Sequence, residues 1–177
     1  MTLNTVDHQC AVIVQARTGS SRLPGKVIAD LGGRPLISFL FERLQRCEAV
    51  SCILLATTDL EMDDCLCEIA MEHGVTVIRG PVHDVLTRYA MAAEATSAQT
   101  LVRVTGDCPF VDPDLLSRLI CDFYSKRVDY MCNNYPPTYP DGLDLEVFSR
   151  EALIRTQAEC ASSEQREHVT PWMRESG

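Results

Sequence analysis

Four short apolar runs, each bounded by glycine or polar residues, dominate the pattern of hydrophobic and polar positions along the chain. Runs of this length that are rich in valine, isoleucine and leucine are typical of strands buried inside a sheet. The pattern therefore predicts strands at residues 10–14, 52–57, 75–78 and 101–104.

Between these runs, apolar residues recur at helical spacing, and the segments carry start or stop signals. Pro35 can occupy the first turn of a helix, Gly74 can end one, and Asp84 can cap one. Helices are predicted from Pro35 to about Cys47, over residues 62–73, from Asp84 to Ala95, and from Asp112 to about Lys126.

Strand and helix thus alternate four times, which favours a parallel sheet covered by helices on both faces. In such sheets, ligands bind beyond the carboxyl ends of the strands. That rule selects the loops at residues 15–26, 57–61, 79–88 and 105–112.

The segment after the fourth helix has a different pattern. Residues 130–132 are short and apolar, and residues 133–142 are rich in turn-forming types. Residues 143–148 alternate apolar with acidic side chains, so they predict a half-exposed strand.

The first of the four loops, residues 15–26, combines three cations, three hydroxyl side chains and two glycines. Glycine lets backbone N–H groups approach a ligand closely, and nearby cations suit a polyphosphate. The loop therefore predicts a nucleoside triphosphate site, with an ordinary strand-to-helix connection as the alternative. It is not a Walker A loop, because five residues separate Gly19 from Gly25 and Val27 follows Lys26. The dinucleotide fingerprint Gly-x-Gly-x-x-Gly is also absent.

Composition and charge narrow the class of protein. The 177 residues, 46% of them hydrophobic, are enough for one globular domain, and the net charge of −9 argues against general binding to nucleic acids or anionic membranes. Residues 1–9 lack the apolar core of a signal peptide, and no stretch approaches about 18 apolar residues, so we expect a cytoplasmic protein. The nine cysteines lack metal-binding spacing. We therefore expect most of them to behave as small buried apolar residues in a reducing compartment, rather than to bind zinc.

A single carboxylate, Asp107, follows the fourth predicted strand directly after Gly106. It is therefore expected at the same edge of the sheet as the cationic first loop. Mg²⁺ is usually held by one or two carboxylates together with substrate phosphates and water, so Asp107 is a candidate Mg²⁺ ligand. The alternative is that Asp107 caps the following turn.

The stretch Gln15-Ala-Arg-Thr-Gly-Ser-Ser-Arg-Leu-Pro-Gly-Lys26 resembles the signature of the cytidylyltransferases that activate sugar acids as CMP-sugars, above all in the branch called spore coat polysaccharide biosynthesis protein SpsF. Residues 103–113, 139–148 and 167–171 are similar to further blocks of that branch, in the same order. The resemblance implies a nucleotide-diphospho-sugar transferase fold of the GT-A-like type. This is an α/β/α sandwich with a mostly parallel, mixed sheet in which the strand at 143–148 is antiparallel.

The resemblance also implies roles for individual residues around CTP. Ala16 and Arg17 would contact the nucleotide, and its phosphates would be bound by Ser21, Arg22 and Lys26. Asp107 would hold Mg²⁺. Arg79, Asp84 and Arg88 lie where relatives contact the base or ribose, although an exposed helical role for Arg88 is an equal alternative. The residues expected to act in catalysis are Arg22, Lys26 and Asp107.

The acceptor site is expected in the loop and strand that follow residue 132, where polar and aromatic side chains gather. Candidate sugar contacts are Tyr139, Asp141, Asp144, Glu146 and His168. Alternate residues of a strand share a face, which would group the acidic members of this set. The alternative is a loop that only forms turns, because the same residue types favour turns.

The expected reaction is attack of a sugar hydroxyl on the α-phosphorus of CTP, with pyrophosphate as the leaving group. Two alternatives stay open: a glycosyltransferase of the same fold, for which Asp112-Pro-Asp114 is the nearest Asp-x-Asp motif, and a non-catalytic nucleotide-binding domain. The resemblance implies that residues 1–177 form a single nucleotidyltransferase domain, which is shorter at its C-terminus than the family members. No aspartate follows Asp144, where many relatives carry a second metal ligand, and a homodimer is a further possibility.

Overall fold

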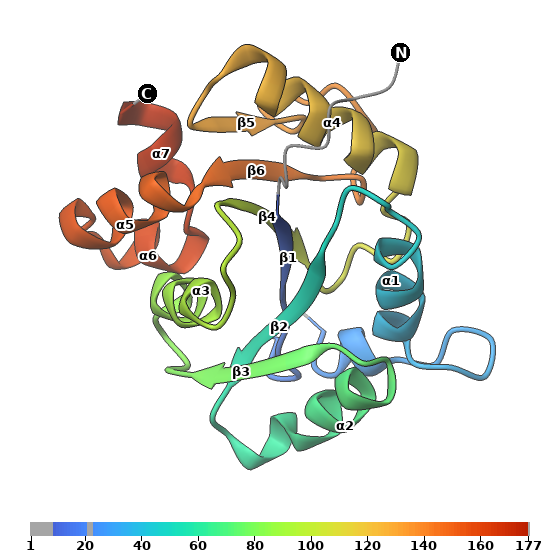
Figure 1. Cartoon of the computed structure of the whole chain (residues 1–177). Coiled ribbons are helices and arrows are strands. Elements are labelled where there is room, and N and C mark those ends of the chain that lie inside the picture. The colour runs from blue at the N-terminus through green and yellow to red at the C-terminus, as the bar shows by residue number, and fades with distance from the viewer. Residues whose placement is uncertain (1–8, 21–22, 177) are drawn as a thin grey trace.

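Six strands form one mixed sheet through the middle of the computed structural model, which describes residues 9–20 and 23–176 (Figure 1). The order across the sheet is β3-β2-β1-β4-β6-β5. The strands are β1 (Cys10–Gln15), β2 (Cys52–Thr58), β3 (Thr76–Gly80), β4 (Thr100–Thr105), β5 (Tyr130–Cys132) and β6 (Glu146–Ser149). Strands β1 to β4 are parallel, and β6 is antiparallel to both of its neighbours.

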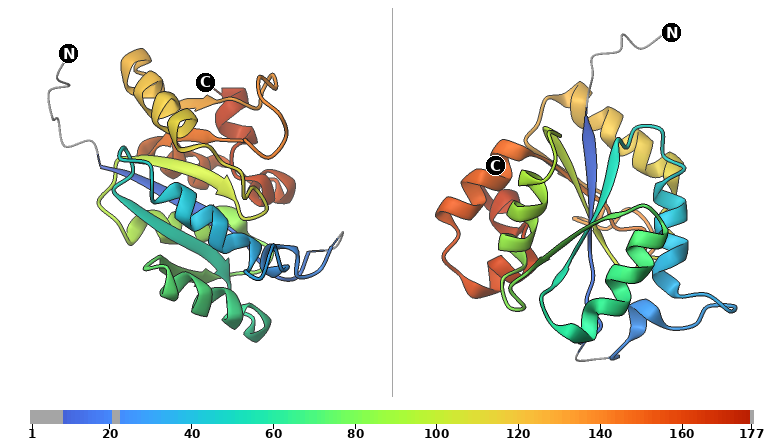
Figure 2. Two further views of the ribbon diagram at one scale, coloured as in Figure 1. Left: turned by 90° about the vertical axis from the view of Figure 1, so that its right-hand side faces the viewer. Right: turned by 60° about the horizontal axis from the view of Figure 1, so that its bottom comes forward.

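Helices cover both faces of this sheet (Figure 2). On one face lie α1 (Leu36–Leu44), α2 (Asp64–Glu72) and α4 (Pro113–Lys126). On the other face lie α3 (Val85–Glu94), α5 (Arg150–Glu159), α6 (Ser163–His168) and α7 (Pro171–Ser176). Two short 3-10 turns, η1 (Lys26–Ile28) and η2 (Glu61–Asp63), complete the described elements. The predicted three-layer α/β/α sandwich with a mostly parallel mixed sheet is confirmed.

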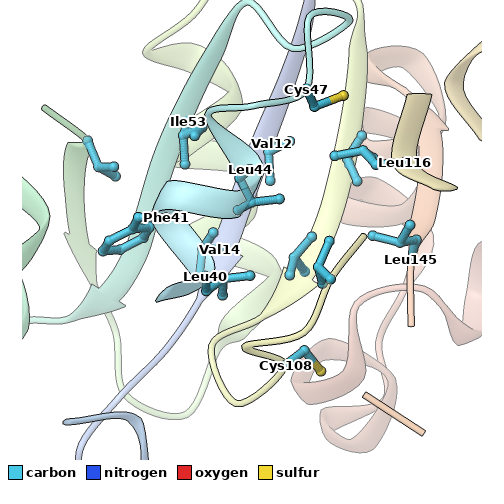
Figure 3. Packing of buried hydrophobic residues seen from close by; sticks show 14 of the residues in the cluster. Val12, Val14, Leu40, Phe41, Leu44, Cys47, Ile53, Cys108, Leu116 and Leu145 are labelled. Atoms are coloured by element: carbon cyan, nitrogen blue, oxygen red, sulfur yellow. The ribbon is translucent and has the colours of Figure 1, made fainter. Parts of the chain in front are cut away.

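The core explains why the β1 run is continuously apolar. Val12 and Val14 face the layer of α1 and α4, where they pack near Leu40 and Leu44 (Figure 3). The alternate residues of β1 pack against α3 on the opposite face. A strand with both faces covered gains from apolar side chains at every position, and that run is what the sequence displays.

The predicted helix boundaries are also confirmed where they rest on capping chemistry. The carboxylate of Asp84 accepts a hydrogen bond from Thr87 N at 2.9 Å, and that of Asp112 accepts one from Leu115 N at 2.8 Å. Asp112 therefore begins α4 and is used as a helix cap, not as half of an Asp-x-Asp metal motif. Gly74, at φ 67°, follows α2 in the left-handed region that favours glycine.

The half-exposed strand predicted at residues 143–148 is wrong in both extent and burial. The strand β6 begins only at Glu146, and its first three residues are buried. It lies between β4 and β5, with helices on both sides, so an acidic residue in it must be paired inside the protein. The sequence pattern also assigned no element after residue 148, where the structure has α5, α6 and α7.

The topology creates a crevice between β1 and β4. The connection through α1 leads from β1 to β2 on one side, whereas α3 lies on the opposite face and leads to β4 on the other side of β1. The loop that leaves β1 leads to α1 and β2, and the loop that leaves β4 leads to α4 and β5, towards opposite edges of the sheet. Ligands bind at such switch points, where the strand order reverses. Among the described helices, none combines the length and the apolar character that a bilayer crossing requires.

Candidate active site

A cavity of about 280 Å³ lies at the switch point, beyond the carboxyl ends of β1 and β4. It is lined by the loops that leave these two strands, by the first turns of α3 and by the end of α6. The lining residues are Gln15, Ala16, Arg17, Ser20, Lys26, Val27, Val85, Arg88, Arg103, Thr105, Gly106, Asp107, Glu167 and His168. Of the four loops selected from the sequence, those at 15–26, 79–88 and 105–112 contribute to this wall.

An ion pair between Lys26 and Asp107 joins the two principal loops across the cavity. Burial by itself raises the pKa of Asp107, but hydrogen bonds from Lys26 and Thr105 outweigh burial and hold that pKa below its ordinary value. The carboxylate is thus ionised and faces the cationic loop. The helix α4 is capped by Asp112 and not by Asp107.

Gly106 allows these loops to approach each other closely. Its backbone N–H donates to Gln15 O at 2.8 Å, and a Cβ at this position would lie 2.6 Å from the Cβ of Ala16. Real Cβ atoms essentially never lie within 3.0 Å of an atom that is not a chain neighbour. The floor of the cavity therefore depends on the missing side chain of Gly106.

Gly106→Ala is expected to destabilise the protein by about 1–3 kcal/mol, the usual cost of overpacking, and to weaken ligand binding in the cavity because the β4 loop must move. Gly19→Ala is the matched control in the facing loop. A Cβ on Gly19 would meet only the Met62 side chain, at 3.8 Å, an ordinary contact. Thermal unfolding of both variants measures the difference, and equal melting temperatures would contradict the steric argument.

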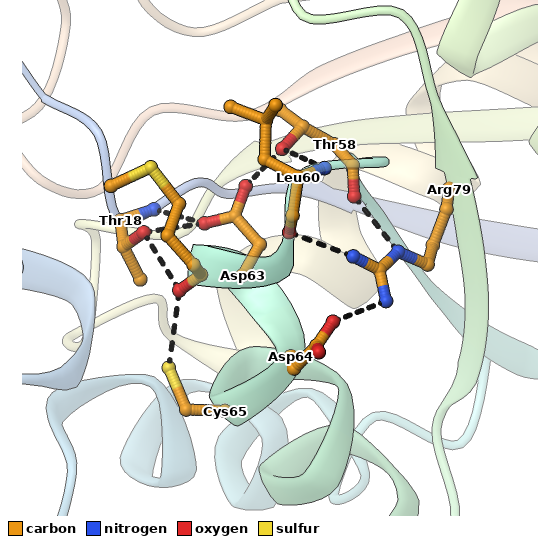
Figure 4. Close-up of polar contacts among 8 residues, drawn as sticks. Thr18, Thr58, Leu60, Asp63, Asp64, Cys65 and Arg79 are labelled. Carbon is orange, nitrogen blue, oxygen red and sulfur yellow. Dashed lines mark hydrogen bonds and ion pairs between the residues drawn. The ribbon is translucent and has the colours of Figure 1, made fainter.

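Asp63 anchors the β1 loop through hydrogen bonds with Thr18 (Figure 4). Its carboxylate is 1% exposed and accepts hydrogen bonds from Thr18 N at 2.7 Å, from Thr18 Oγ1 at 2.6 Å and from the hydroxyl of Thr58. The carbonyl of Thr18 in turn accepts from Ser20 N and Gly25 N, at 2.9 and 2.8 Å. The buried carboxylate thus shapes the cationic loop. Sequence reasoning missed Asp63, because helical spacing placed it in a helix and nothing in its spacing points to Thr18.

Asp63→Asn is expected to lower the free energy of unfolding by about 1–3 kcal/mol, because the amide cannot accept all of these hydrogen bonds. Burial alone raises the pKa of Asp63, but the hydrogen bonds from Thr18 and Thr58 hold it below its ordinary value of 3.8. A depressed folded-state pKa stabilises the protein above about pH 4, and this contribution is lost as the pH falls through the folded pKa. Urea unfolding of wild type and of Asp63→Asn, at about one measurement per pH unit from about pH 3 to about pH 7, gives the free energy of unfolding at each pH. If the free energy of the variant fell with pH as steeply as that of wild type, this assignment would be contradicted.

Two residues that were predicted to contact the nucleotide make structural contacts within the protein. Arg79 donates to Thr58 O at 3.0 Å and to Leu60 O at 2.8 Å, and it does not line the cavity. Asp84 caps α3 and pairs with Arg166 at 2.8 Å. Contact with a base or ribose stays a prediction for both.

Arg88 is not the exposed helix residue that one of its two alternatives predicted. It is 1% exposed, and its Nη1 donates to Pro81 O at 2.7 Å and to Val82 O at 3.2 Å. Burial, reinforced by the nearby charge of Arg17, lowers its pKa. The exposed alternative is therefore wrong: Arg88 forms a buried part of the cavity wall, and its Nε has no hydrogen-bond partner among the described residues.

The remaining predicted nucleotide residues divide into two groups. Ala16, Arg17 and Lys26 line the cavity. Ser21 and Arg22 lie outside the described residues, so their phosphate-binding roles stay predictions. Ser20, which was not assigned a role from the sequence, also lines the wall.

A second cavity, of about 540 Å³, adjoins the first. The two share Arg103 and His168 as lining residues. Glu146 lines the second cavity, but its side chain is only 6% exposed and pairs with Arg103 at 2.7 Å, while Tyr130 donates its hydroxyl hydrogen to the same carboxylate at 3.1 Å. Sequence reasoning missed Arg103, although a cation within an otherwise apolar strand is an informative signal.

The other predicted sugar contacts are not gathered at this cavity. Tyr139 lines a separate hollow beside α4, and Asp141 and Asp144 precede β6 and do not share a strand with Glu146. Burial, and then repulsion from Asp141, raises the pKa of Asp144. The strand-face argument for grouping these carboxylates is therefore wrong, whereas His168 does lie beside both cavities.

The donor set fits a metal that arrives with a ligand. Within residues 9–20 and 23–176, no group of three or more histidine, cysteine or acidic side chains could enclose a metal ion. Asp107 supplies one ionised carboxylate beside a cationic loop. Mg²⁺ bound by one carboxylate, phosphates and water needs no more from the protein.

Comparisons with known proteins place the chain. A family model described as cytidylyltransferase matches residues 11–176. The spore coat polysaccharide biosynthesis protein SpsF of Bacillus subtilis is 35% identical over 92% of the chain, and a 3-deoxy-manno-octulosonate cytidylyltransferase of Trichlorobacter lovleyi is 35% identical over 65%. A solved cytidylyltransferase structure from Leptospira borgpetersenii is similar with a TM-score of 0.90 and 33% identity over 94% of the chain.

The chain spans 68% of the SpsF protein, 45% of the octulosonate enzyme and 71% of the Leptospira chain. The matched region nevertheless includes both strands that form the cavity, the cationic loop and Asp107. By its sequence and by its fold, the chain belongs to the cytidylyltransferase family.

Proposed function

We propose that this chain binds CTP in the cavity of about 280 Å³ and transfers CMP to a sugar, in particular a sugar acid, with release of pyrophosphate. The observation that carries the proposal is the meeting of Lys26 and Asp107 at the switch point of the sheet. A polyphosphate needs cations and backbone N–H groups, and the β1 loop offers both. The family membership supplies cytidylyl transfer as the reaction.

In this reaction a sugar hydroxyl attacks the α-phosphorus of CTP. The bond between the α-phosphorus and the oxygen that bridges it to the β-phosphorus breaks, and pyrophosphate leaves. Little covalent work falls to the protein, so catalysis rests on positioning and charge neutralisation. Lys26 neutralises the β- and γ-phosphates, and Arg17 adds positive charge at the cavity wall. Arg22, outside the described residues, is proposed for the same task.

We propose Mg²⁺ as the cofactor, with Asp107 as its protein ligand. The bound ion would polarise phosphate oxygens and compensate their charge. Asp107 itself remains ionised at neutral pH, since Lys26 helps to keep its pKa low, and it is therefore ready to bind a cation.

The setting of this reaction is proposed from the relatives and from the cysteines. The name of the SpsF relative refers to spore coat polysaccharide synthesis, and we propose a role in surface or spore coat polysaccharide formation. All nine cysteines fall among the described residues and are free, as suits a reducing cytoplasm. A homodimer is consistent with this proposal and stays a prediction.

The test is calorimetric binding of CTP, UTP, ATP and GTP with and without Mg²⁺, followed by pyrophosphate release with candidate sugar acids. We expect the tightest binding for CTP and release of pyrophosphate with at least one sugar acid. Equal affinity for UDP-sugars would favour the glycosyltransferase alternative. Tight CTP binding with no transfer to any sugar would favour the non-catalytic nucleotide-binding domain.

A further inference from the structure

We propose that the cavity of about 540 Å³ is the acceptor site and that Arg174 binds the carboxylate of a sugar acid there. This inference rests on the proposed function and deepens it, because it names the group that selects the acceptor class. Neither Arg174 nor this cavity follows from the phosphate-loop signature.

The position of the cavity suits an acceptor. It shares Arg103 and His168 with the nucleotide cavity, so a ligand in it lies directly beside the bound triphosphate. Its volume is within the range of small-molecule sites. Its wall is largely polar, with glutamate, glutamine, serine and threonine side chains that can bind sugar hydroxyls.

The two arginines of this wall differ in how their charge is compensated. The Arg103 side chain is 13% exposed and is paired with Glu146 at 2.7 Å, so its charge is already neutralised. Arg174 is half-buried and makes no ion pair with any residue in the described part of the chain. Its guanidinium lies 4.5 Å from the ring centroid of Tyr135. Stacking holds the planar group in place and leaves its edge N–H donors for a ligand.

A carboxylate is the ligand that this arrangement fits best. A guanidinium binds a carboxylate through two parallel hydrogen bonds, which neutral hydroxyls cannot match in strength. The wall also contains Glu164 and Glu175, but both are exposed to solvent, and Glu175 accepts a hydrogen bond from Gln165 Nε2 at 3.4 Å. Water weakens the repulsion between these two glutamates and an anion. Arg174 is less exposed, so its attraction for an anion is weakened less.

The backbone before α7 is built to hold this wall. Val169 has φ 70° and ψ −56°, a conformation that is rare and strained for a β-branched residue, and Thr170 N donates to His168 O at 2.8 Å across it. Val169 is fully buried in the core beneath α3 and α5, which maintains the strained turn. His168 and Thr170 thereby line the cavity, and Arg174 follows in α7 on the same side.

The experiment measures binding of sugar acids to the whole chain saturated with CDP, which fills the nucleotide cavity but has no pyrophosphate to release. The probes are 3-deoxy-manno-octulosonate and N-acetylneuraminate, each compared with its methyl ester, which keeps the sugar and removes the charge. The variants are Arg174→Gln, Arg174→Lys and the control Arg155→Gln. Arg155 pairs with Asp129 at 2.6 Å and lines no part of this cavity.

We expect at least one acid to bind, and its ester to bind about 10–100-fold more weakly. Arg174→Gln should weaken binding of the acid to the level of the ester and leave the ester unchanged, whereas Arg155→Gln should bind both as wild type does. Arg174→Lys should retain part of the preference for the acid, because it keeps the charge but loses the stacked fork.

The inference is overturned if acid and ester bind equally, if Arg174→Gln keeps the preference for the acid, or if no acid binds while CTP does. Binding of CTP to the wild type is measured in parallel. If the wild type did not bind CTP, the proposed function itself would be contradicted. Failure of the proposed function and failure of this inference are therefore distinguishable. A thermal melt of Arg174→Gln that matches wild type shows that the variant is folded.

Discussion

Lys26→Ala is expected to weaken CTP binding by about 100-fold, the largest effect on affinity of any single substitution considered for this chain. The substitution removes a charge-assisted hydrogen bond to the phosphates. It also leaves Asp107, which pairs with Lys26 in the nucleotide cavity, as an uncompensated negative charge facing the triphosphate. Isothermal titration calorimetry with CTP and Mg²⁺ measures the change.

Two features make this experiment specific. Arg46→Ala removes a cation that is exposed and remote from the cavity lining, so it controls for the general change in net charge. CMP should lose less affinity than CTP in Lys26→Ala, because the side chain is assigned to the β- and γ-phosphates. An equal loss for CMP and CTP would show that Lys26 does not bind those phosphates.

Asp107→Asn is expected to lower the Mg²⁺-dependent rate of pyrophosphate release by about 10²–10³-fold, by analogy with the loss of one preorganised electrostatic contact. The amide has nearly the same shape as the carboxylate and can still accept a hydrogen bond from Lys26, but it is a poor ligand for Mg²⁺. The reason for the loss is therefore the missing charge at the metal position.

The same variant has a second consequence of opposite sign. Without Mg²⁺, CTP should bind Asp107→Asn at least as tightly as wild type, since a negative charge facing the phosphates has been removed. Asp112→Asn is the control: asparagine caps a helix as well as aspartate does, and Asp112 does not line the cavity. An unchanged response of the Asp107→Asn rate to Mg²⁺ would contradict the assignment of the metal ligand.

The architecture was largely predictable, because it depends on features that are local in the sequence. Continuous apolar runs indicate strands that are buried on both faces, and the alternation with helices indicates parallel pairing. Parallel strands bring their carboxyl ends to one edge, so Lys26 and Asp107, 81 positions apart, could be expected near each other without knowledge of any contact.

The contacts that hold the site together could not be predicted in this way. Glu146 looked half-exposed, because acidic residues alternate with apolar ones in its segment. The antiparallel register of β4 and β6 places it opposite Arg103, and the buried pair allows a carboxylate inside the sheet. Hydrophobic periodicity records which positions are buried, but it carries no information on register between strands that are distant in the sequence.

The sequence by itself therefore determined the alternation of strands and helices from β1 to α4, the edge of the sheet that carries the chemistry, and the cationic loop and acid that face each other there. Only the tertiary structure decided which charges are free and which are already paired: Asp63 supports the β1 loop, Arg103 is neutralised, and Arg174 is available. The physical reason is that the state of a charge depends on its partner and its burial, and both arise from packing between distant segments.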